Sequence, residues 1–386
     1  MKATDVLEVL EKAGIDFFAG VPDSLLRPFC DAVFHKYGQE AKRHFVAHNE
    51  GGAVGCAAGY HLATGKIPCV YMQNSGVGNA VNPVASLTSP YVYGIPVLYI
   101  IGWRGQPGIP DEPQHQFQGM ITETLLNVME LAVFRLTAET SVDELAARLE
   151  RFRGVFRSGQ SAAILVESGA LSGEKRVYAN DYIVNREAAM EHIASAARED
   201  MMVTSTGKIS RELFEIRERT GRTHDRDFLT VGSMGHDSMI ALGIALRKPE
   251  RRVWCVQGDG AFLMHLGALA EVGSLGCKNM RYIVLNNAAH ESVGGLPTCA
   301  GTADLAAVAA ACGIRNAFRA ASLDELDKAL DVMKNMAALS FLEVRCALGS
   351  RKDLGRPATA PAANKTALMK VLEEGGGRIE YGVYEF

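Results

Sequence analysis

Short apolar runs that end in polar or glycine-rich turns alternate with helix-like segments along most of the chain. In the first part these runs are HFVAHNE, IPCVYMQNS and IPVLYIIGW. Later runs of the same kind are MMVTSTG, RRVWCVQGDG, MRYIVLNN and ALSFLEVRC. Strands that alternate with helices predict an α/β fold, in which a mostly parallel sheet is flanked by helices.

The alternation is interrupted once, near the middle of the chain. The apolar run SAAILVES closes the first half, and the helical pattern NREAAMEHIASAARED opens the second. Between them, LSGEKRVYANDYI carries charge and glycine without a period. Because 386 residues are enough for two domains, we expect two similar domains at 1–170 and 184–375, a linker at 171–183 and a C-terminal tail at 376–386.

Composition narrows the range of partners. The formal net charge of −4 shows none of the basic excess that nucleic-acid or anionic-membrane binding requires. The eight cysteines form no C-x-x-C pair, so we interpret most of them as small core residues. The N-terminus is an amphipathic helix rather than a signal peptide, and no apolar run approaches the ~18 residues of a membrane span. These features predict a soluble cytoplasmic protein that acts on small molecules.

The stretch VQGDGAF places an acid between two glycines at the end of an apolar run. Gly260 is followed by 25 residues and then by Asn286 and Asn287, which end the run MRYIVLNN. A right-handed crossover would bring both strand ends to the same sheet edge. A carboxylate, an amide oxygen and a helix that opens at Ala261 suit a hard cation and a diphosphate. Gly258-Asp259-Gly260 alone is equally typical of a helix-capping turn, but its distance from Asn287 predicts a magnesium–diphosphate site.

This spacing resembles the fingerprint of thiamine diphosphate (ThDP) enzymes, and two further motifs fit the same family. In HNEGG, Glu50 matches the glutamate that holds N1′ of the aminopyrimidine ring. In TVGSMGHDS, Met234 matches the apolar residue that bends the cofactor, and the Gly232 carbonyl matches the acceptor for its 4′-amino group, with Ser233 between them. Taken alone, Glu50 would be an acid at a helix N-terminus and Met234 a core residue.

The resemblance also implies a ligand set and a reaction. Magnesium would be held by Asp259, Asn287 and the carbonyl of Ala289, and the diphosphate would lie on the backbone of the glycine turn. Glu50 would favour the imino tautomer of the cofactor, whose ylide attacks a 2-keto acid before carbon dioxide leaves. The cofactor-binding residues implied are Glu50, Asn74, Ser75, Gly76, Gly232, Ser233, Met234, Gly258, Asp259, Gly260, Ala261 and Asn287.

Over nearly its whole length the chain resembles the phosphonopyruvate decarboxylases, a two-domain group within this family. The motifs FAGVPDSLL, DEPQHQFQG, TSTGKISREL and NNAAHESVGGLPT carry the resemblance. Most other 2-keto acid decarboxylases of the type have a central third domain, where this chain has only a linker. The resemblance implies decarboxylation of 3-phosphonopyruvate to phosphonoacetaldehyde and CO2 in phosphonate biosynthesis.

Candidate substrate residues lie in the predicted loops at the strand ends. By resemblance, Asp23 lies over the thiazolium ring and handles protons, although a turn acid after a proline would look the same. His115 stands where relatives carry an active-site histidine pair, with Gln114 in place of its partner. Lys208, at the start of a predicted helix, would favour an anion, although an exposed lysine in a first helical turn would look the same. The remaining substrate candidates, ranked below Lys208 and His115, are the loop residues Arg104, His290 and Glu291.

In this family Glu50 and Asp259 would come from different subunits, which predicts at least a homodimer with active sites at the interface. Small residues in GGAVGCAAGY fit such an interface and equally fit packing within a domain. One alternative keeps the cofactor but changes the acid to 3-sulfopyruvate, an isosteric sulfonate. Another is a non-catalytic nucleotide-binding protein, in which the glycine turn binds a sugar or phosphate.

Overall fold

The computed structural model describes residues 1–39 and 42–374. The predicted tail at 376–386, and residue 375 before it, lie outside this part of the chain. Within the described residues, every helix is too short or too polar to cross a lipid bilayer. All eight cysteines are free thiols.

The chain folds into two compact units. The first comprises Met1–Val177 and a short later stretch, Val293–Leu296. The second comprises Tyr178–Ser292 and the described residues from Pro297 onward. The domain boundaries inferred from the sequence remain a prediction.

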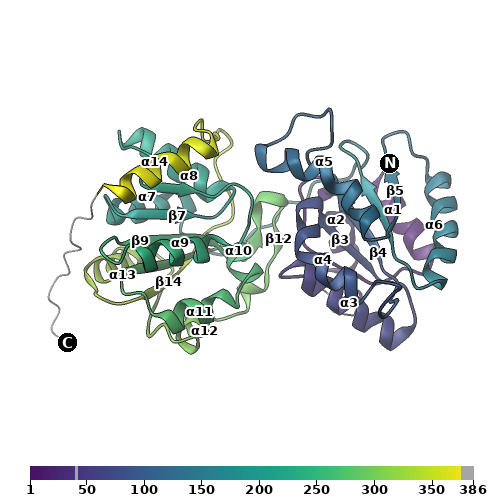
Figure 1. The fold of residues 1–386 in the computed structure, drawn as a ribbon, viewed down its shortest axis with the longest axis horizontal. Coiled ribbons are helices and arrows are strands. Elements are labelled where there is room, and N and C mark those ends of the chain that lie inside the picture. The colour runs from purple at the N-terminus through teal and green to yellow at the C-terminus, as the bar shows by residue number, and fades with distance from the viewer. Residues whose placement is uncertain (40–41, 375–386) are drawn as a thin grey trace. The chain divides into compact units, whose positions relative to one another are not determined.

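The first unit is a parallel six-stranded sheet in the order β2-β1-β3-β4-β6-β5. Helices lie on both of its faces (Figure 1). Its strands are β1 Phe18–Gly20, β2 His44–Val46, β3 Cys69–Gln73, β4 Leu98–Gly102, β5 Ala132–Leu136 and β6 Ala162–Val166. Its helices are α1 Ala3–Lys12, α2 Arg27–Tyr37, α3 Glu50–Thr64, α4 Val77–Ser86, α5 Pro113–Val128 and α6 Val142–Arg157.

The second unit repeats this plan with the order β13-β14-β10-β9-β7-β8, again parallel. Its strands are β7 Met201–Thr204, β8 Asp227–Leu229, β9 Val253–Gly258, β10 Met280–Asn286, β13 Asn316–Ala320 and β14 Ser340–Arg345. Its helices are α7 Arg186–Ala197, α8 Lys208–Arg219, α9 Asp237–Arg247, α10 Asp259–Met264, α11 Ala268–Leu275, α12 Leu305–Ala311, α13 Leu323–Asn335 and α14 Pro361–Glu373.

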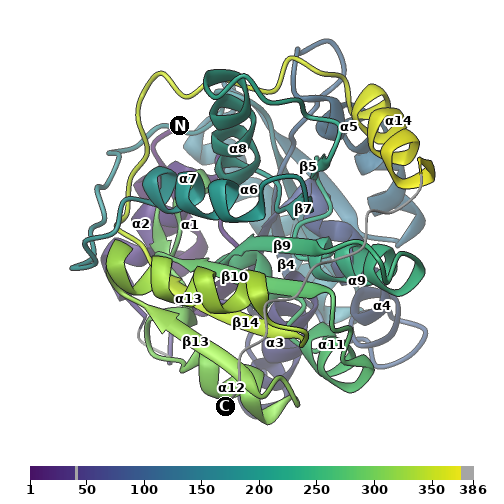
Figure 2. The same cartoon turned by 90° about the vertical axis from the view of Figure 1, so that its left-hand side faces the viewer.

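Strand β9 shows why its sequence is a continuous apolar run. Trp254 and Val256 pack into the core beneath α7, α8 and α13, whereas Val253 and Cys255 pack into the core beneath α9, α11 and α12. Figure 2 shows these helix groups on the two sides of the sheet. Successive side chains of a strand point to opposite faces, so a strand covered on both faces must be apolar throughout. The predicted α/β fold with mostly parallel, helix-flanked sheets is therefore confirmed.

Two local expectations were wrong. The segment that starts at Pro113 is a helix, α5, and not a loop. The helix expected to open at Ala261 begins two residues earlier, at Asp259. It is short and ends at Met264, because His265 leaves the helical conformation (φ −129°, ψ 46°) before α11.

Candidate active site

The carboxyl edge of the first unit's sheet gathers polar residues that follow its strands. Asp23 comes after β1, Asn74 directly after β3 and Arg104 after β4. The Asn74 amide donates to the Arg104 carbonyl (2.8 Å) and accepts from the Arg104 backbone N–H (3.1 Å). The Asn74 amide also donates to Thr122 on α5 (2.9 Å). Open parallel sheets bind their ligands at this edge, and Asn74 serves there to fix the loops.

Glu50 is the first residue of α3, and its side chain is buried. Asn79 on α4 donates to its Oε2 (2.8 Å). Burial raises the pKa of Glu50 above its usual range, and the bond from Asn79 offsets only part of that rise. A Cβ atom on Gly76 would lie 2.2 Å from Glu50 Oε1, so only glycine fits beside this carboxyl group. The raised pKa suits a group that exchanges a proton with a ring nitrogen.

Asp23 is fully buried at the centre of a hydrogen-bond chain. Its Oδ2 accepts from the backbone N–H groups of Leu25 (3.0 Å) and Leu26 (3.1 Å), and its Oδ1 accepts from Gln73 (2.5 Å). Gln73 in turn accepts from the Ser75 hydroxyl (2.6 Å). Burial raises the pKa of Asp23 despite these bonds. The chain ties the turn after β1 to the turn after β3, and Gln73 is a site residue that the sequence did not reveal.

Arg104 does not present a free positive charge. Its Nε and Nη2 donate to the two carboxylate oxygens of Asp111 (2.7 and 2.5 Å), and its Nη1 donates to Ser24 (2.8 Å). Burial alone would raise the pKa of Asp111, but the Arg104 contacts outweigh it and lower that pKa well below its usual range. Any anion bound by Arg104 would have to share it with Asp111.

His115 lies in the first turn of α5 rather than in a loop, and it is buried. Burial, and then the charge of Arg104, lower its pKa, so the imidazole is neutral. Among the described residues its Nδ1 has no hydrogen-bond partner, nor do the buried side-chain oxygens of Gln106, Gln114 and Gln118. Buried polar groups normally have partners, so this cluster marks a place where a ligand could bind. The i, i+4 spacing of Gln114 and Gln118 is the only sequence signal for it.

In the second unit, Asp259 follows β9 directly, with Gly258 as the N-cap of α10. Its buried Oδ2 accepts from the Thr298 hydroxyl (2.5 Å), and the backbone N–H of Asn287 also donates to its carboxylate. The two motifs spaced along the sequence therefore meet. Burial raises the pKa of Asp259 to about 7. Within the described chain no basic side chain pairs with it, although buried carboxylates normally pair or bind metal.

The two asparagines at the end of β10 have different roles: Asn286 stabilises the turn, and Asn287 belongs to the candidate site. Asn286 donates to Glu343 (2.8 Å) and accepts from the Ala288 N–H (2.9 Å), which holds Ala288 in the left-handed region (φ +55°). Asn287 Oδ1 accepts from the N–H of Ala289 (3.2 Å). This turn places Asn287 and the residues that follow it at the same sheet edge as Asp259.

Met234 sits in a loop with unusual backbone conformation. Gly232, Ser233 and Gly235 all have positive φ (+73°, +46° and +86°). For a residue with a side chain, such as Ser233, this conformation is uncommon and often marks a functional site. A Cβ atom on Gly235 would lie 2.7 Å from the Ala261 carbonyl oxygen, so the loop packs closely on α10.

Met234 and His290 both lie beside Gly260. A Cβ atom there would be 3.2 Å from Met234 Cε and 3.0 Å from His290 Nδ1. Burial lowers the pKa of His290 to about 4, so this imidazole is neutral. The structure thus joins the glycine turn, the methionine loop and the turn after β10 into one site.

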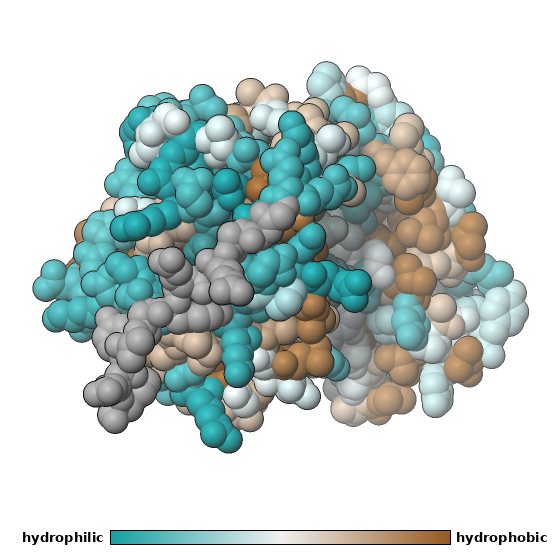
Figure 3. Space-filling model, turned by 60° about the vertical axis from the view of Figure 1, so that its left-hand side comes forward, coloured by the Kyte–Doolittle hydropathy of each residue, from teal (hydrophilic) through white to brown (hydrophobic). Residues whose placement is uncertain are grey.

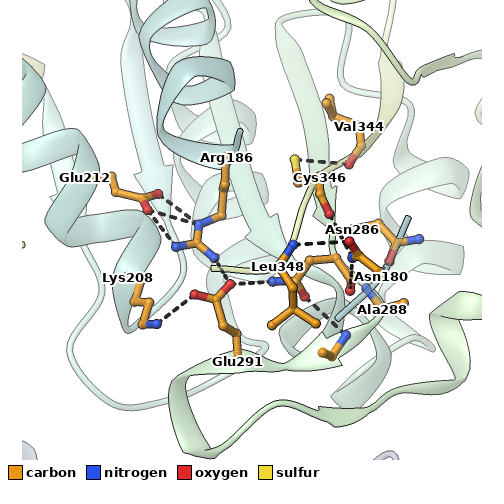
Figure 4. A network of polar contacts seen from close by, with 12 residues as sticks. Asn180, Arg186, Lys208, Glu212, Asn286, Ala288, Glu291, Val344, Cys346 and Leu348 are labelled. Atoms are coloured by element: carbon orange, nitrogen blue, oxygen red, sulfur yellow. Dashed lines mark hydrogen bonds and ion pairs between the residues drawn. The ribbon is translucent and has the colours of Figure 1, made fainter. Parts of the chain in front are cut away.

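Lys208, the first residue of α8, donates to Glu291 (2.7 Å). Figure 4 shows that Glu291 also faces Arg186, which pairs with Glu212 on its other side. Burial would raise the pKa of Glu291, but Arg186 and Lys208 together lower it. Lys208, like Arg104, is therefore already paired with a carboxylate.

The side chains around Asp259 fit a hard cation. The donors available are its own carboxylate, the amide oxygen of Asn287 and the carbonyl of Ala289. Among the described residues, no group of three His, Cys, Asp or Glu could hold a metal. An oxygen-only set with a single carboxylate is typical of Mg²⁺, which keeps ligands from its substrate or cofactor and from water.

Two domain families match the chain. "Thiamine pyrophosphate enzyme, N-terminal TPP binding domain" matches residues 2–126, which include Glu50. "Thiamine pyrophosphate enzyme, C-terminal TPP binding domain" matches residues 205–344, which include Asp259 and Asn287. Thiamine pyrophosphate is another name for ThDP, so each of the two matched domains carries one half of the predicted cofactor site.

Three curated proteins are similar over most of their length. A phosphonopyruvate decarboxylase of Streptomyces viridochromogenes is 36% identical over 379 residues, which cover 93% of this chain and 92% of the relative. That of Streptomyces hygroscopicus is 35% identical, covering 94% and 91%. A sulfopyruvate decarboxylase of Methanosarcina acetivorans is more distant, at 28% identity, covering 93% and 95%. Together with the two ThDP domains, this similarity shows that the chain belongs to the phosphonopyruvate decarboxylase family of ThDP-dependent enzymes.

Proposed function

We propose that the protein decarboxylates 3-phosphonopyruvate to phosphonoacetaldehyde and CO2, as a step of phosphonate biosynthesis. The observation that carries the cofactor chemistry is the buried Asp259, which pairs with no basic side chain among the described residues and is joined to Asn287 in the ThDP-binding domain. The names and high coverage of the two Streptomyces relatives support the substrate. Eight free thiols fit the cytoplasm that the sequence predicts.

Magnesium is held in this proposal by Asp259, Asn287 and the Ala289 carbonyl. The backbone of Gly258, Gly260 and Ala261 faces the diphosphate. The pyrimidine end is received by Glu50, Asn74, Ser75, Gly76, Gly232, Ser233 and Met234. When bound, ThDP supplies an electron sink for the pair left by the departing CO2.

Buried side chains of this protein carry out the proton transfers in this proposal. Glu50 holds and releases a proton at its Oε1, beside Gly76. Asp23 has a raised pKa and His115 a lowered one, so near neutral pH each is closer to its uncharged form than an exposed counterpart would be. We propose that both move protons at the reacting carbon, whereas His290 lines the cofactor beside Met234.

Both candidate cations for the phosphonate are already paired with carboxylates. Arg104 is paired with Asp111, and Lys208 with Glu291. Either cation can bind the dianion only by sharing it with the carboxylate already there. The unpartnered atoms near His115 are glutamine side-chain oxygens, which only accept hydrogen bonds, so a phosphonate bound there requires these amides to turn their NH₂ groups towards it.

A homodimer or larger assembly is the third part of the proposal. On α3, Gly55, Cys56 and Gly59 face solvent, and Leu62 is 74% exposed. A Cβ atom on either glycine would meet nothing within 4 Å, so packing within the unit does not require glycine at these two positions. Apolar side chains gather on the first unit at the right of Figure 3. These surfaces support close packing against a second copy, with domains at 1–170 and 184–375 contributing to shared sites.

Gly76→Ala is expected to lower kcat at least tenfold, because its methyl group would displace the Glu50 carboxyl. Crowding of this kind also costs about 1–3 kcal/mol of stability. Gly78, two residues further on, is exposed, and a Cβ atom there meets nothing within 4 Å. Gly78→Ala should therefore keep both kcat and melting temperature. A wild-type kcat in Gly76→Ala would show that Glu50 does not need its present position.

The proposed reaction is tested by incubating the purified protein with phosphonopyruvate and measuring CO2 and aldehyde. Both products should form in equal amounts and only when ThDP and Mg²⁺ are present. Product formation without ThDP, or none with it, would overturn the proposal. Family membership already argues against a non-catalytic nucleotide-binding protein.

A further inference from the structure

Glu291 lies at the centre of the polar network in Figure 4, with only 8% of its side chain exposed. Its Oε1 accepts from Lys208 (2.7 Å). Its Oε2 accepts from Asn287 Nδ2 (2.7 Å) and also faces the guanidinium of Arg186. Arg186 is held on its other side by Glu212 (2.6 Å). One buried carboxylate thus connects the starts of α7 and α8 with the turn after β10.

The contact with Glu291 decides which way the Asn287 amide points. An ionised carboxylate can only accept hydrogen bonds, so the atom that Asn287 turns towards it must be the NH₂ group. Oδ1 then points away from Glu291, where it accepts from the Ala289 N–H (3.2 Å) and retains a free lone pair. Without that carboxylate, only the 3.2 Å bond from the Ala289 N–H, among the described contacts of the side chain, would oppose a flip that presents the NH₂ group to a cation.

The backbone of the same residue is held from the linker. Asn180 Nδ2 donates to the carbonyl of Asn287 (2.8 Å) and to that of Cys346 (3.1 Å). Asn180 Oδ1 accepts from the Leu348 N–H (3.3 Å). With the main chain fixed in this way, the orientation of the side-chain amide depends on its bonds to Glu291 and to the Ala289 N–H.

We propose that Glu291 is a positioning residue that orients the Asn287 amide oxygen towards the magnesium ion, with Arg186 and Lys208 holding Glu291 in place. This inference rests on the proposed function. The charges of Arg186 and Lys208 are balanced by Glu212 and Glu291. Loss of the Glu291 charge would therefore also leave an excess positive charge next to the turn that carries Asn287.

Glu291→Met is expected to raise the Mg²⁺ concentration needed for half-maximal ThDP binding, because methionine cannot accept the bond from Asn287 Nδ2 as a carboxylate does. Loss of a partner that orients a metal ligand typically costs about 10–100-fold in metal affinity. The titration would use calorimetry of ThDP binding at a series of Mg²⁺ concentrations. The melting temperature and near-ultraviolet circular dichroism of the ligand-free variant would establish that it is folded. Should Glu291→Met not fold, Glu291→Asp keeps the charge but draws the carboxylate back from Asn287, and the same measurement should show a smaller rise.

Two controls separate orientation from charge and general stability. Glu215→Gln removes a carboxylate from α8 whose partners among the described residues are Arg351 and Gly355, and it should keep the Mg²⁺ midpoint within about threefold. Glu291→Gln removes the charge, but its side-chain oxygen can still accept from Asn287 Nδ2, so it should raise the midpoint less than Glu291→Met does. A folded Glu291→Met or Glu291→Asp protein with the wild-type midpoint would overturn this inference alone, whereas wild-type ThDP binding that ignores Mg²⁺ would overturn the proposed metal site with it.

Discussion

Glu50→Gln is expected to abolish nearly all turnover while ThDP still binds within a few-fold of its normal affinity. Glutamine keeps the length of the side chain and can still accept the bond from Asn79. It cannot hold and release the proton, and a lost acid–base group typically costs about 10²–10⁴-fold in rate. Aldehyde formation measures kcat, and calorimetry measures the affinity for ThDP.

The matched control is Glu144→Gln, which removes an exposed acid from the first turn of α6 in the same unit. It should leave kcat unchanged. Hydrogen–deuterium exchange at C2 of bound ThDP gives a second readout, and it should slow as much as turnover does in Glu50→Gln. Turnover within tenfold of wild type would remove Glu50 from the mechanism.

Asp259→Asn is expected to lower the affinity for ThDP in the presence of Mg²⁺ by at least about 100-fold. Loss of a residue that only orients a metal ligand typically lowers metal affinity by about 10–100-fold, and loss of a ligand's charge should cost more. The amide can still accept from Thr298 but brings no charge to the cation. Burial without a basic partner disfavours the carboxylate form, so the ligand-free variant should melt at the same temperature as wild type or higher. ThDP titrations and thermal melts measure the two effects.

Asp324→Asn, an exposed acid in the first turn of α13, serves as the control with the same change of charge. It should change neither the affinity for ThDP nor the melting temperature of the ligand-free protein. An Asp259→Asn protein that binds ThDP and Mg²⁺ normally would place the metal elsewhere.

The strands of both sheets could be predicted because parallel strands covered on two faces are apolar throughout, as β9 is. Helix α5 could not be predicted, because it buries polar and small side chains and exposes large apolar ones. His115, Gly119 and Thr122 lie on its buried side, whereas Phe117 and Met120 are more than half exposed. Helix periodicity predicts a helix when its apolar side is the buried one, and a helix that turns apolar residues outward does not show this pattern.

The candidate site follows the same division. The meeting of Asp259 with Asn287 could be predicted, because both follow strands joined by one crossover. The hydrogen-bond partners of the site residues could not be predicted. Thr298 reaches Asp259 from 39 positions further along the chain, and Lys208 reaches Glu291 from 83 positions before it. No local pattern encodes such pairs, because tertiary packing alone brings them together.

The pairing of the candidate cations also explains why the sequence cannot rank the substrates. Lys208 and Arg104 look like free anion-binding residues until Glu291 and Asp111 are seen beside them. Phosphonate and sulfonate analogues of pyruvate are isosteric and differ by one charge at neutral pH. Discrimination therefore depends on how much positive charge remains uncompensated at the site.

The most direct test compares phosphonopyruvate, sulfopyruvate and pyruvate by kcat/KM for aldehyde formation with ThDP and Mg²⁺ present. Since competing substrates are discriminated by this ratio, it measures the preference of the site without any assumption about its residues. The proposed function predicts the highest value for phosphonopyruvate. A higher value for sulfopyruvate would keep the cofactor chemistry but contradict the substrate, and no aldehyde from any of the three acids would contradict the proposed decarboxylation itself.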